Sequence, residues 1–284
     1  MHYLGPRSIV GFRGFTGLHF ASIFGLVKIT RVLTMMGGVD INGVDETSAT
    51  PLIWDAMNGR EAVVKVLLGR KEIDPDRPDS GGRAPISWAA GGGHETMVKL
   101  LLGRKGVYPD RPDIKVRTPI SWAAENGHEA VVKLLLGLED VNPDRPDGGG
   151  RTPISLAAGN GHGGIVKLLL GRKGVNPDRL NHWHRTPIFL AAEDGHEAVV
   201  ELLLGREDVN PDRPDKSSRT PISRAAENGH DSVVRLLFGR KDVNPNRPDS
   251  KGRTPISWAA ENGHELVVQL FHGPKDVDPD KPDV

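Results

Sequence analysis

The sequence predicts an all-α solenoid of stacked antiparallel helix pairs with projecting, hairpin-like connectors. Three observations lead to this prediction. A Thr-Pro pair, or a close variant of it, recurs every 34 residues, and a Gly-His pair keeps the same register in most copies. An apolar run of the type Val-Val-x-Leu-Leu-Leu follows the Gly-His pair. A fixed period of this length indicates a series of similar units that bury their apolar faces by stacking on one another.

We divide the chain into a lead-in, residues 1–15, and a repeat array, residues 16–284. The array contains eight units, of which the last is cut short in its connector. The third to eighth units are near-copies, whereas the first two have diverged. The units begin at residues 16, 50, 84, 118, 152, 186, 220 and 254.

The fourth unit shows how each copy is expected to fold. Thr118 is a suitable N-cap because its hydroxyl can accept a hydrogen bond from the first helical turn. Pro119 suits the next position because a proline has no N–H that would lack a partner there. Gly127 is expected to end the first helix in a left-handed conformation. The second helix, from about Glu129 to Leu136, is apolar around most of its circumference, so we expect it to be buried on two or more sides.

The connectors are expected to be extended loops rather than third helices. Pro143 and Pro146 prevent regular ladder pairing in the connector after the fourth unit. Val116 and His184 stand where several other connectors carry glycine. If this position requires a positive φ, a β-branched valine is unfavourable there.

Residues 118–142 resemble the ankyrin repeat, because Thr-Pro, Ala-Ala, Gly-His, Val-Val-x-Leu-Leu-Leu and Asp-Val-Asn follow one another in the order of that family. The resemblance covers about residues 11–284. The 34-residue period also fits tetratricopeptide repeats, but their Trp…Leu-Gly…Tyr pattern and longer helices are absent. The histidine of the family pattern Thr-Pro-Leu-His is present only at His19. Most units carry serine there, which can bond only locally, so we expect one hydrogen bond between units to change.

Composition and charge exclude several classes of function. The chain has 37 basic and 37 acidic residues, which argues against a nucleic-acid or anionic-lipid surface. It has no cysteine, and therefore no disulfide framework and no cysteine zinc site. We find no signal peptide and no apolar run of about 18 residues. We expect an intracellular protein, without a preference between cytoplasm and nucleus.

The sequence carries no motif for catalysis, a cofactor or a metal. Phosphate-binding, zinc-protease and nucleophile-elbow motifs are absent, so we expect neither enzymatic activity nor a cofactor. The histidines of the Gly-His pairs recur once per unit, about 10 Å apart at normal helix spacing, which is too far for one ion. We interpret them as bonding to the backbone at the helix turn. The segment His182-Trp183-His184 could hold zinc weakly, but it offers no third ligand.

The resemblance implies a non-catalytic scaffold that binds a protein or peptide on its concave groove and connector tips. A sensor or regulatory arm, or a fragment, of a larger multidomain signalling protein is the alternative. We expect no nucleic-acid or membrane partner, and a monomer. End-to-end self-association through the last unit is a third hypothesis.

Candidate partner-binding residues lie at the ends of the first helices and where the connectors differ. The helix-end set consists of Glu125, Asn126, Glu193, Asp194, Glu227, Asn228, Glu261 and Asn262. The connector set consists of Ile114, Lys115 and Val116 before the fourth unit and His182, Trp183 and His184 before the sixth. The alternatives are an unspecialised soluble surface for the first set and neutral drift for the second.

Arg224 is the last candidate residue. It stands where four units have tryptophan, at Trp54, Trp88, Trp122 and Trp258. We interpret the tryptophans mainly as packing along the stack. Arg224 is expected either to lie against Trp258 in a cation–π contact or to face a partner.

Overall fold

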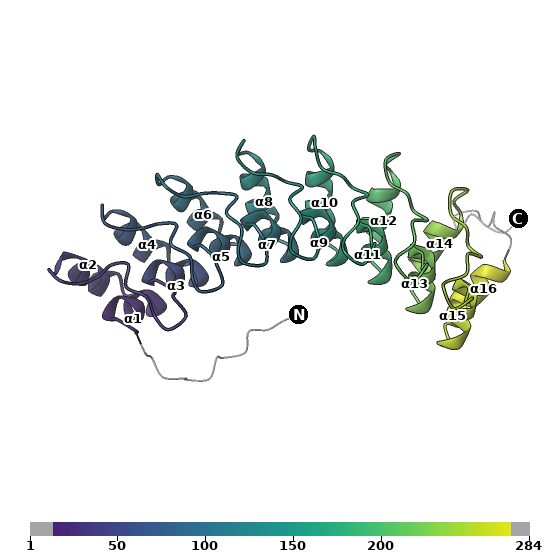
Figure 1. Ribbon diagram of the computed structural model, residues 1–284, viewed down its shortest axis with the longest axis horizontal. Helices are drawn as coiled ribbons and strands as arrows, with labels where there is room; N and C mark the ends of the chain where they lie inside the picture. Colours follow the sequence, from purple (N-terminus) through teal and green to yellow (C-terminus); the bar gives the residue numbers. More distant parts are fainter. Residues whose placement is uncertain (1–13, 274–284) are drawn as a thin grey trace, which may run out of the picture. The chain divides into compact units, whose positions relative to one another are not determined.

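The computed structural model describes residues 14–273 and shows sixteen helices in this range, arranged as eight consecutive pairs without a strand (Figure 1). The predicted all-α fold of repeated helix pairs is therefore confirmed. Most of the lead-in predicted for residues 1–15, and residues 274–284 of the last connector, lie outside the described residues. Within the described residues, no helix is long and apolar enough to cross a membrane.

Each unit contributes a first and a second helix. The first helices are α1 (Gly17–Phe24), α3 (Pro51–Asn58), α5 (Pro85–Gly91), α7 (Pro119–Glu125), α9 (Pro153–Gly159), α11 (Pro187–Glu193), α13 (Pro221–Glu227) and α15 (Pro255–Glu261). The second helices are α2 (Val27–Met35), α4 (Glu61–Leu68), α6 (Glu95–Leu102), α8 (Glu129–Leu136), α10 (Gly163–Leu170), α12 (Glu197–Leu204), α14 (Asp231–Phe238) and α16 (Glu265–His272).

The predicted start of the first helix is confirmed where the cap is described. The hydroxyl of Thr186 accepts a hydrogen bond from the N–H of Phe189, and a proline follows the cap at once. Thr50 caps α3 in the same way. In the units with serine, the side chain turns inward to its own cap, as in Ser223, whose hydroxyl lies 2.8 Å from the carbonyl of Thr220. His19 instead reaches the carbonyl of Ala49, which directly precedes the second unit. The expected change in bonding between units is therefore present.

The histidines of the Gly-His pairs link each unit to the one before it. The Nε2 atom of His230 lies 3.0 Å from the backbone oxygen of Glu193, which is 37 residues earlier. The interpretation that these histidines bond to the backbone is confirmed, but the acceptor belongs to the preceding unit. The glycine makes this possible, because a Cβ on Gly195 would lie 2.5 Å from the ring of His230. Gly195 also has a φ of 75°, which an L side chain rarely adopts.

The described chain divides into two compact units, Met1–Ala123 with Ala130–Val141, and Ala124–Glu129 with Asn142–Val284. We call them the N-terminal and the C-terminal block. In the N-terminal block α1, α3 and α5 pack in series, as do α2, α4 and α6. In the C-terminal block the two series are α9, α11, α13, α15 and α10, α12, α14, α16. Fully buried alanines such as Ala89 and Ala225 let neighbouring first helices approach closely.

Within residues 14–273 the connectors contain neither helix nor strand, and arginine side chains hold them together. The guanidinium of Arg213 donates to the backbone oxygen of Asp178 at 3.2 Å and lies 2.9 Å from its carboxylate. Burial raises the pKa of Asp178, while the charge of Arg213 opposes this shift. Arginine side chains thus link neighbouring connectors, where the prolines prevent β-type pairing of the backbones. The same link recurs at Arg77–Asn42, Arg111–Asp76, Arg179–Asp144 and Arg247–Asp212.

The connector tips require a left-handed residue, as expected. Gly82 has a φ of 73°, and at the same position Val116 has a φ of 61° and His184 a φ of 59°. A β-branched side chain is strained in this region of φ. The tip before the fourth unit therefore keeps its shape at a cost in stability.

Asp55 is a buried carboxyl group in the N-terminal block. It is fully buried on α3, at a position where the seven other units have alanine. One carboxylate oxygen accepts a hydrogen bond from the hydroxyl of Ser22 at 2.9 Å, and the other has no hydrogen-bond partner. Burial raises the pKa of Asp55 from 3.8 to about 8. The folded chain therefore holds this carboxyl in its protonated form at neutral pH.

The variant Val116→Gly is expected to raise the free energy of unfolding by about 1 kcal/mol, because glycine adopts the required φ without strain. Urea unfolding followed by circular dichroism measures this change. The matched control is Gly252→Val, where φ is 78° and an added Cβ meets nothing within 4 Å. This control should lower stability by conformational strain alone. A lower unfolding midpoint for Val116→Gly would contradict the role given to this position.

The variant Asp55→Ala is expected to be more stable than the wild type, and by more at pH 8 than at pH 5. Between the unfolded pKa of 3.8 and the folded pKa of about 8, the folded chain binds a proton that the unfolded chain releases. The wild-type free energy of unfolding therefore falls as pH rises through this range and stays low above it. Urea unfolding at both pH values measures the difference. An equal gain at pH 5 and pH 8 would show that Asp55 does not titrate as described.

Candidate functional site

The first helices and connector tips form one face of each block, which we call the first-helix face. An aspartate at the connector tip organises this face before the second to eighth units, except before the sixth unit, where Asn181 takes its place. One carboxylate oxygen of Asp79 accepts hydrogen bonds from the N–H groups of Gly81 and Arg83, both at 2.9 Å. The other accepts from the indole N–H of Trp88 at 3.0 Å. The tryptophan is thus fixed to the tip by a hydrogen bond as well as by packing.

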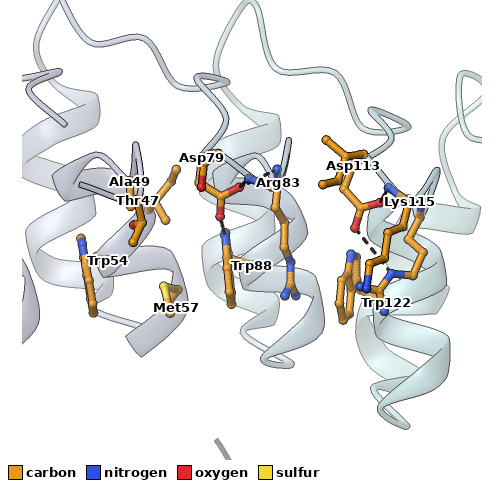
Figure 2. A pocket seen from close by; sticks show the side chains of 15 residues that line it. Thr47, Ala49, Trp54, Met57, Asp79, Arg83, Trp88, Asp113, Lys115 and Trp122 are labelled. Atoms are coloured by element: carbon orange, nitrogen blue, oxygen red, sulfur yellow. Dashed lines mark hydrogen bonds and ion pairs between the residues drawn. The ribbon is translucent and has the colours of Figure 1, made fainter. Parts of the chain in front are cut away.

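Arginines just before the caps stack on these indoles. The guanidinium carbon of Arg83 lies 3.8 Å from the ring centroid of Trp88 and 3.6 Å from that of Trp122 (Figure 2). The guanidinium carbon of Arg117 also stacks on Trp122, at 3.4 Å from its ring centroid. All three contacts are short enough for strong cation–π attraction. We call this alternation of indoles and guanidiniums the ladder.

A groove of about 310 Å³ opens over the ladder in the N-terminal block (Figure 2). Trp54, Trp88 and Trp122 line it together with Met57 and the connector tips. The indoles are partly exposed, so the groove offers flat apolar surface beside guanidinium groups. Such a mixture of aromatic and arginine side chains is typical of the centres of protein interfaces.

The connector before the fourth unit contributes to this groove. Ile114 and Lys115 line it, and Ile114 is 72% exposed. Val116 is 42% exposed. The sequence reasoning missed Arg83 and Arg117, although a signal was present, since each lies four residues after an aspartate and five before a tryptophan.

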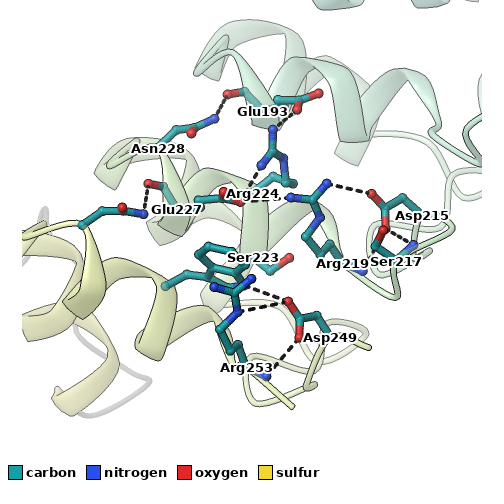
Figure 3. A network of polar contacts seen from close by, with 12 residues as sticks. Glu193, Asp215, Ser217, Arg219, Ser223, Arg224, Glu227, Asn228, Asp249 and Arg253 are labelled. Carbon is teal, nitrogen blue, oxygen red and sulfur yellow. Dashed lines mark hydrogen bonds and ion pairs between the residues drawn. The ribbon is translucent and has the colours of Figure 1, made fainter. Parts of the chain in front are cut away.

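In the C-terminal block, the helix-end glutamates are paired with arginines of the same face. The carboxylate of Glu193 lies 2.9 Å from Arg185. It also bonds Arg224 (Figure 3). The carboxylate of Glu227 lies 3.4 Å from Arg219 and bonds the other side of Arg224. The side chains of Glu193 and Arg224 are only 11% and 15% exposed.

The expected contact between Arg224 and Trp258 is wrong. The guanidinium carbon that stacks on Trp258 belongs to Arg253, at 3.3 Å from the ring centroid. Arg224 lies instead between two carboxylates, which attract a guanidinium more strongly than an indole does. Burial lowers the pKa of Arg224, but its hydrogen bonds to Glu193 and Glu227 outweigh this and raise the pKa.

The acidic character expected of the helix ends is largely balanced within the chain. Glu125 lies 4.0 Å from Arg151, and Glu261 lies 3.2 Å from Arg253. Asp194 is an exposed residue, but partial burial and the neighbouring charge of Glu193 raise its pKa. The asparagines remain exposed at Asn126, Asn228 and Asn262. The last two also donate to backbone oxygens of the preceding unit, those of Glu193 and Glu227, at 2.7 and 3.0 Å.

The connector before the sixth unit presents an aromatic side chain. Trp183 is 55% exposed, and His182 and His184 beside it are exposed as well. The indole lies over the preceding connector, where a Cβ on Gly149 would be 3.6 Å from it. Among residues 14–273, no cluster of three or more His, Asp or Glu side chains could hold a metal ion.

The variant Arg224→Leu is expected to lower the free energy of unfolding by about 1 kcal/mol, because Glu193 and Glu227 each keep only one arginine partner. Leucine occurs at this position in the fifth and sixth units, so the helix should tolerate it. The control is Arg206→Leu, which breaks an exposed pair with Asp208 and should have a smaller effect. Urea unfolding at low and high salt measures both. Equal effects of the two variants would contradict the network.

The family model for ankyrin repeats (three copies) matches residues 18–113, 107–181, 154–249 and 188–283. The comparison with curated proteins found no match. Ankyrin repeats are generally protein–protein interaction modules and are typically non-catalytic. Because these overlapping matches extend from residue 18 to residue 283, and the helix pairs and their caps follow the same period, the chain belongs to the ankyrin repeat family.

Proposed function

We propose that this protein is a non-catalytic scaffold that binds a protein or peptide on its first-helix face and connector tips. The groove over the ladder in the N-terminal block is the observation that carries this proposal. It combines about 310 Å³ of open space with partly exposed indoles from three consecutive units. Indole and guanidinium groups supply large contact areas with few rotatable bonds, which favours binding of a partner.

The connector tips extend the proposed surface. Ile114 and Trp183 are exposed apolar side chains on loops whose backbones are fixed by hydrogen bonds. Exposed apolar side chains on a rigid loop lose little entropy on binding. We propose Lys115, Val116, His182 and His184 as their neighbours in the interface.

The helix ends are the third part of the proposed surface. Asn126, Asp194, Asn228 and Asn262 are exposed and can bond to a partner. Glu125, Glu193, Glu227, Glu261 and Arg224 belong to the same surface, but their charges are already paired with side chains of the chain itself. We propose that these residues shape the surface and supply hydrogen bonds rather than net charge. We retain residues 16–284 as the proposed extent of the array, preceded by the lead-in of residues 1–15.

Selection of short random peptides against the full chain tests this proposal. The peptides recovered are expected to bind at least about tenfold more weakly to the double variant Trp54→Leu, Trp122→Leu, or to Trp183→Ala, than to the wild type. Leucine occupies the tryptophan position in the fifth and sixth units, so the fold should be preserved. Isothermal titration calorimetry measures the affinities.

The control is Lys99→Ser, which alters an exposed residue of the second helix α6. Peptides that lose affinity for this control and keep it for the groove and tip variants would place binding on another face. That result would contradict the proposed function.

A further inference from the structure

In the N-terminal block, the residue just before a cap can take a place within the ladder. Arg83, which directly precedes the third unit, lies between Trp88 of that unit and Trp122 of the fourth. In the first unit Phe15 takes this place, with its ring centroid 5.5 Å from Phe20 and 5.5 Å from Trp54. Where two consecutive first helices of this block carry aromatic residues, a long side chain at this position therefore inserts between them.

Ala49 is the exception. In the sequence, the eight residues at this position are Phe15, Ala49, Arg83, Arg117, Arg151, Arg185, Arg219 and Arg253. A methyl group is too short to reach between two indoles. The space between Trp54 and Trp88 is therefore open to the groove, and Ala49, Trp54, Met57 and Trp88 all line it (Figure 2). We call this space the slot.

The two indoles that form the walls of the slot are each held by the aspartate of their own connector tip. The indole N–H of Trp54 donates to Asp45 at 2.9 Å, and that of Trp88 donates to Asp79 at 3.0 Å. The backbone of Ala49 is held by the same carboxylate that holds the tip, as the backbone of Arg83 is. A guanidinium entering the slot would find both indoles held by hydrogen bonds to tip carboxylates, whereas of the two indoles around Arg83 only that of Trp88 is held in this way.

The charges around the slot favour a cation. Asp45, Asp79 and Asp113 occupy three consecutive tips of the N-terminal block, but only Arg83 and Arg117 stand at the corresponding ladder positions. Two positions further along the ladder, Arg117 lies 3.5 Å from Asp113, so a guanidinium in this place approaches the tip carboxylate. Hydrogen bonds from Thr47 and Trp54 outweigh the effect of burial and lower the pKa of Asp45, so its carboxylate is charged at neutral pH. Lys115 also lines the groove, but at the tip beside Arg117 rather than in the slot.

The chain itself shows a correlation between the residue that closes the tip and the residue at the ladder position. Wherever arginine fills the ladder position, the residue four places earlier is Asp or Asn, and where Phe15 fills it, that residue is Gly11. Before Ala49 stands Asp45, so the slot has the carboxylate that accompanies arginine and lacks the arginine. An aromatic occupant would leave this carboxylate without its cation.

We propose that the slot between Trp54 and Trp88 binds an arginine side chain of the partner, which takes the place that Ala49 leaves open. The proposal rests on the proposed function and names the chemistry of the partner at this site. A planar guanidinium can stack on both indoles at once. The ammonium group of lysine is more strongly hydrated and stacks less well.

Titration with N-acetyl-arginine methylamide tests the slot directly. The probe is added to the ¹⁵N-labelled full chain, and the indole N–H signals are followed by NMR. The signals of Trp54 and Trp88 are expected to shift with a dissociation constant on the order of millimolar, at least about tenfold tighter than for the lysine and phenylalanine analogues. Tighter binding of the phenylalanine analogue, or no shift with any probe, would overturn the proposal.

The decisive variant is Ala49→Arg, which supplies the guanidinium from the chain itself. It should fold normally, because six other units carry arginine at this position. The shifts caused by the probe are expected to disappear in this variant and in Trp54→Leu. They should persist in Trp258→Leu, the same change in another unit. Unchanged binding of the probe to Ala49→Arg would overturn the proposal.

The peptides selected against the groove separate this proposal from the proposed function. If they lose affinity for Ala49→Arg and contain an arginine whose replacement by alanine has the same effect, both proposals are supported. If they bind Ala49→Arg as well as the wild type but fail on Trp54→Leu, Trp122→Leu, the slot proposal is overturned and the groove remains. If they bind all these variants equally, both are overturned.

Discussion

A single Asp side chain, replaced by Asn181 before the sixth unit, closes each connector tip before the second to eighth units and determines the geometry of the first-helix face. In Asp79, one oxygen closes the tip by accepting two backbone N–H groups, and the other orients the indole of Trp88. Closing the tip in this way also requires a left-handed residue at Gly82. The turn places Arg83 just before the cap, from where its guanidinium reaches between the indoles. Asn181 closes its tip with the same two backbone contacts but without the charge.

The period then makes every rung of the ladder independent of the others. A ladder residue contacts its own unit and the next one, so a substitution alters one rung and leaves the helix pairs unchanged. Arg224 converts one rung of the C-terminal block into an ion-pair cluster with Glu193 and Glu227. Ala49 opens another in the N-terminal block. An array of near-copies can therefore present different local surfaces without any change in fold.

Those parts of the structure that depend on local physics could be predicted from the sequence. Thr186 caps its helix, and Val116 takes a positive φ, because each outcome is decided within a few residues. The pairing of Glu193 with Arg185 and Arg224 could not be predicted, since it joins residues 8 and 31 positions apart through the stacking of helices. Ala49 was overlooked for a different reason. A missing side chain forms no motif, and its meaning appears only once Arg83 is seen between two indoles.

The chain has equal numbers of basic and acidic residues, and on this face many of the opposite charges are paired with one another. In the C-terminal block, the glutamates at the helix ends have arginine partners within 4.0 Å, so the field that reaches solvent is weak. Attraction of a partner at long range is therefore not what this surface provides. Selectivity has to come from contacts at short range, namely stacking on fixed indoles and hydrogen bonds to oriented carboxylates. Such contacts distinguish partners by shape and by the geometry of a cation, and they persist at salt concentrations that abolish electrostatic steering.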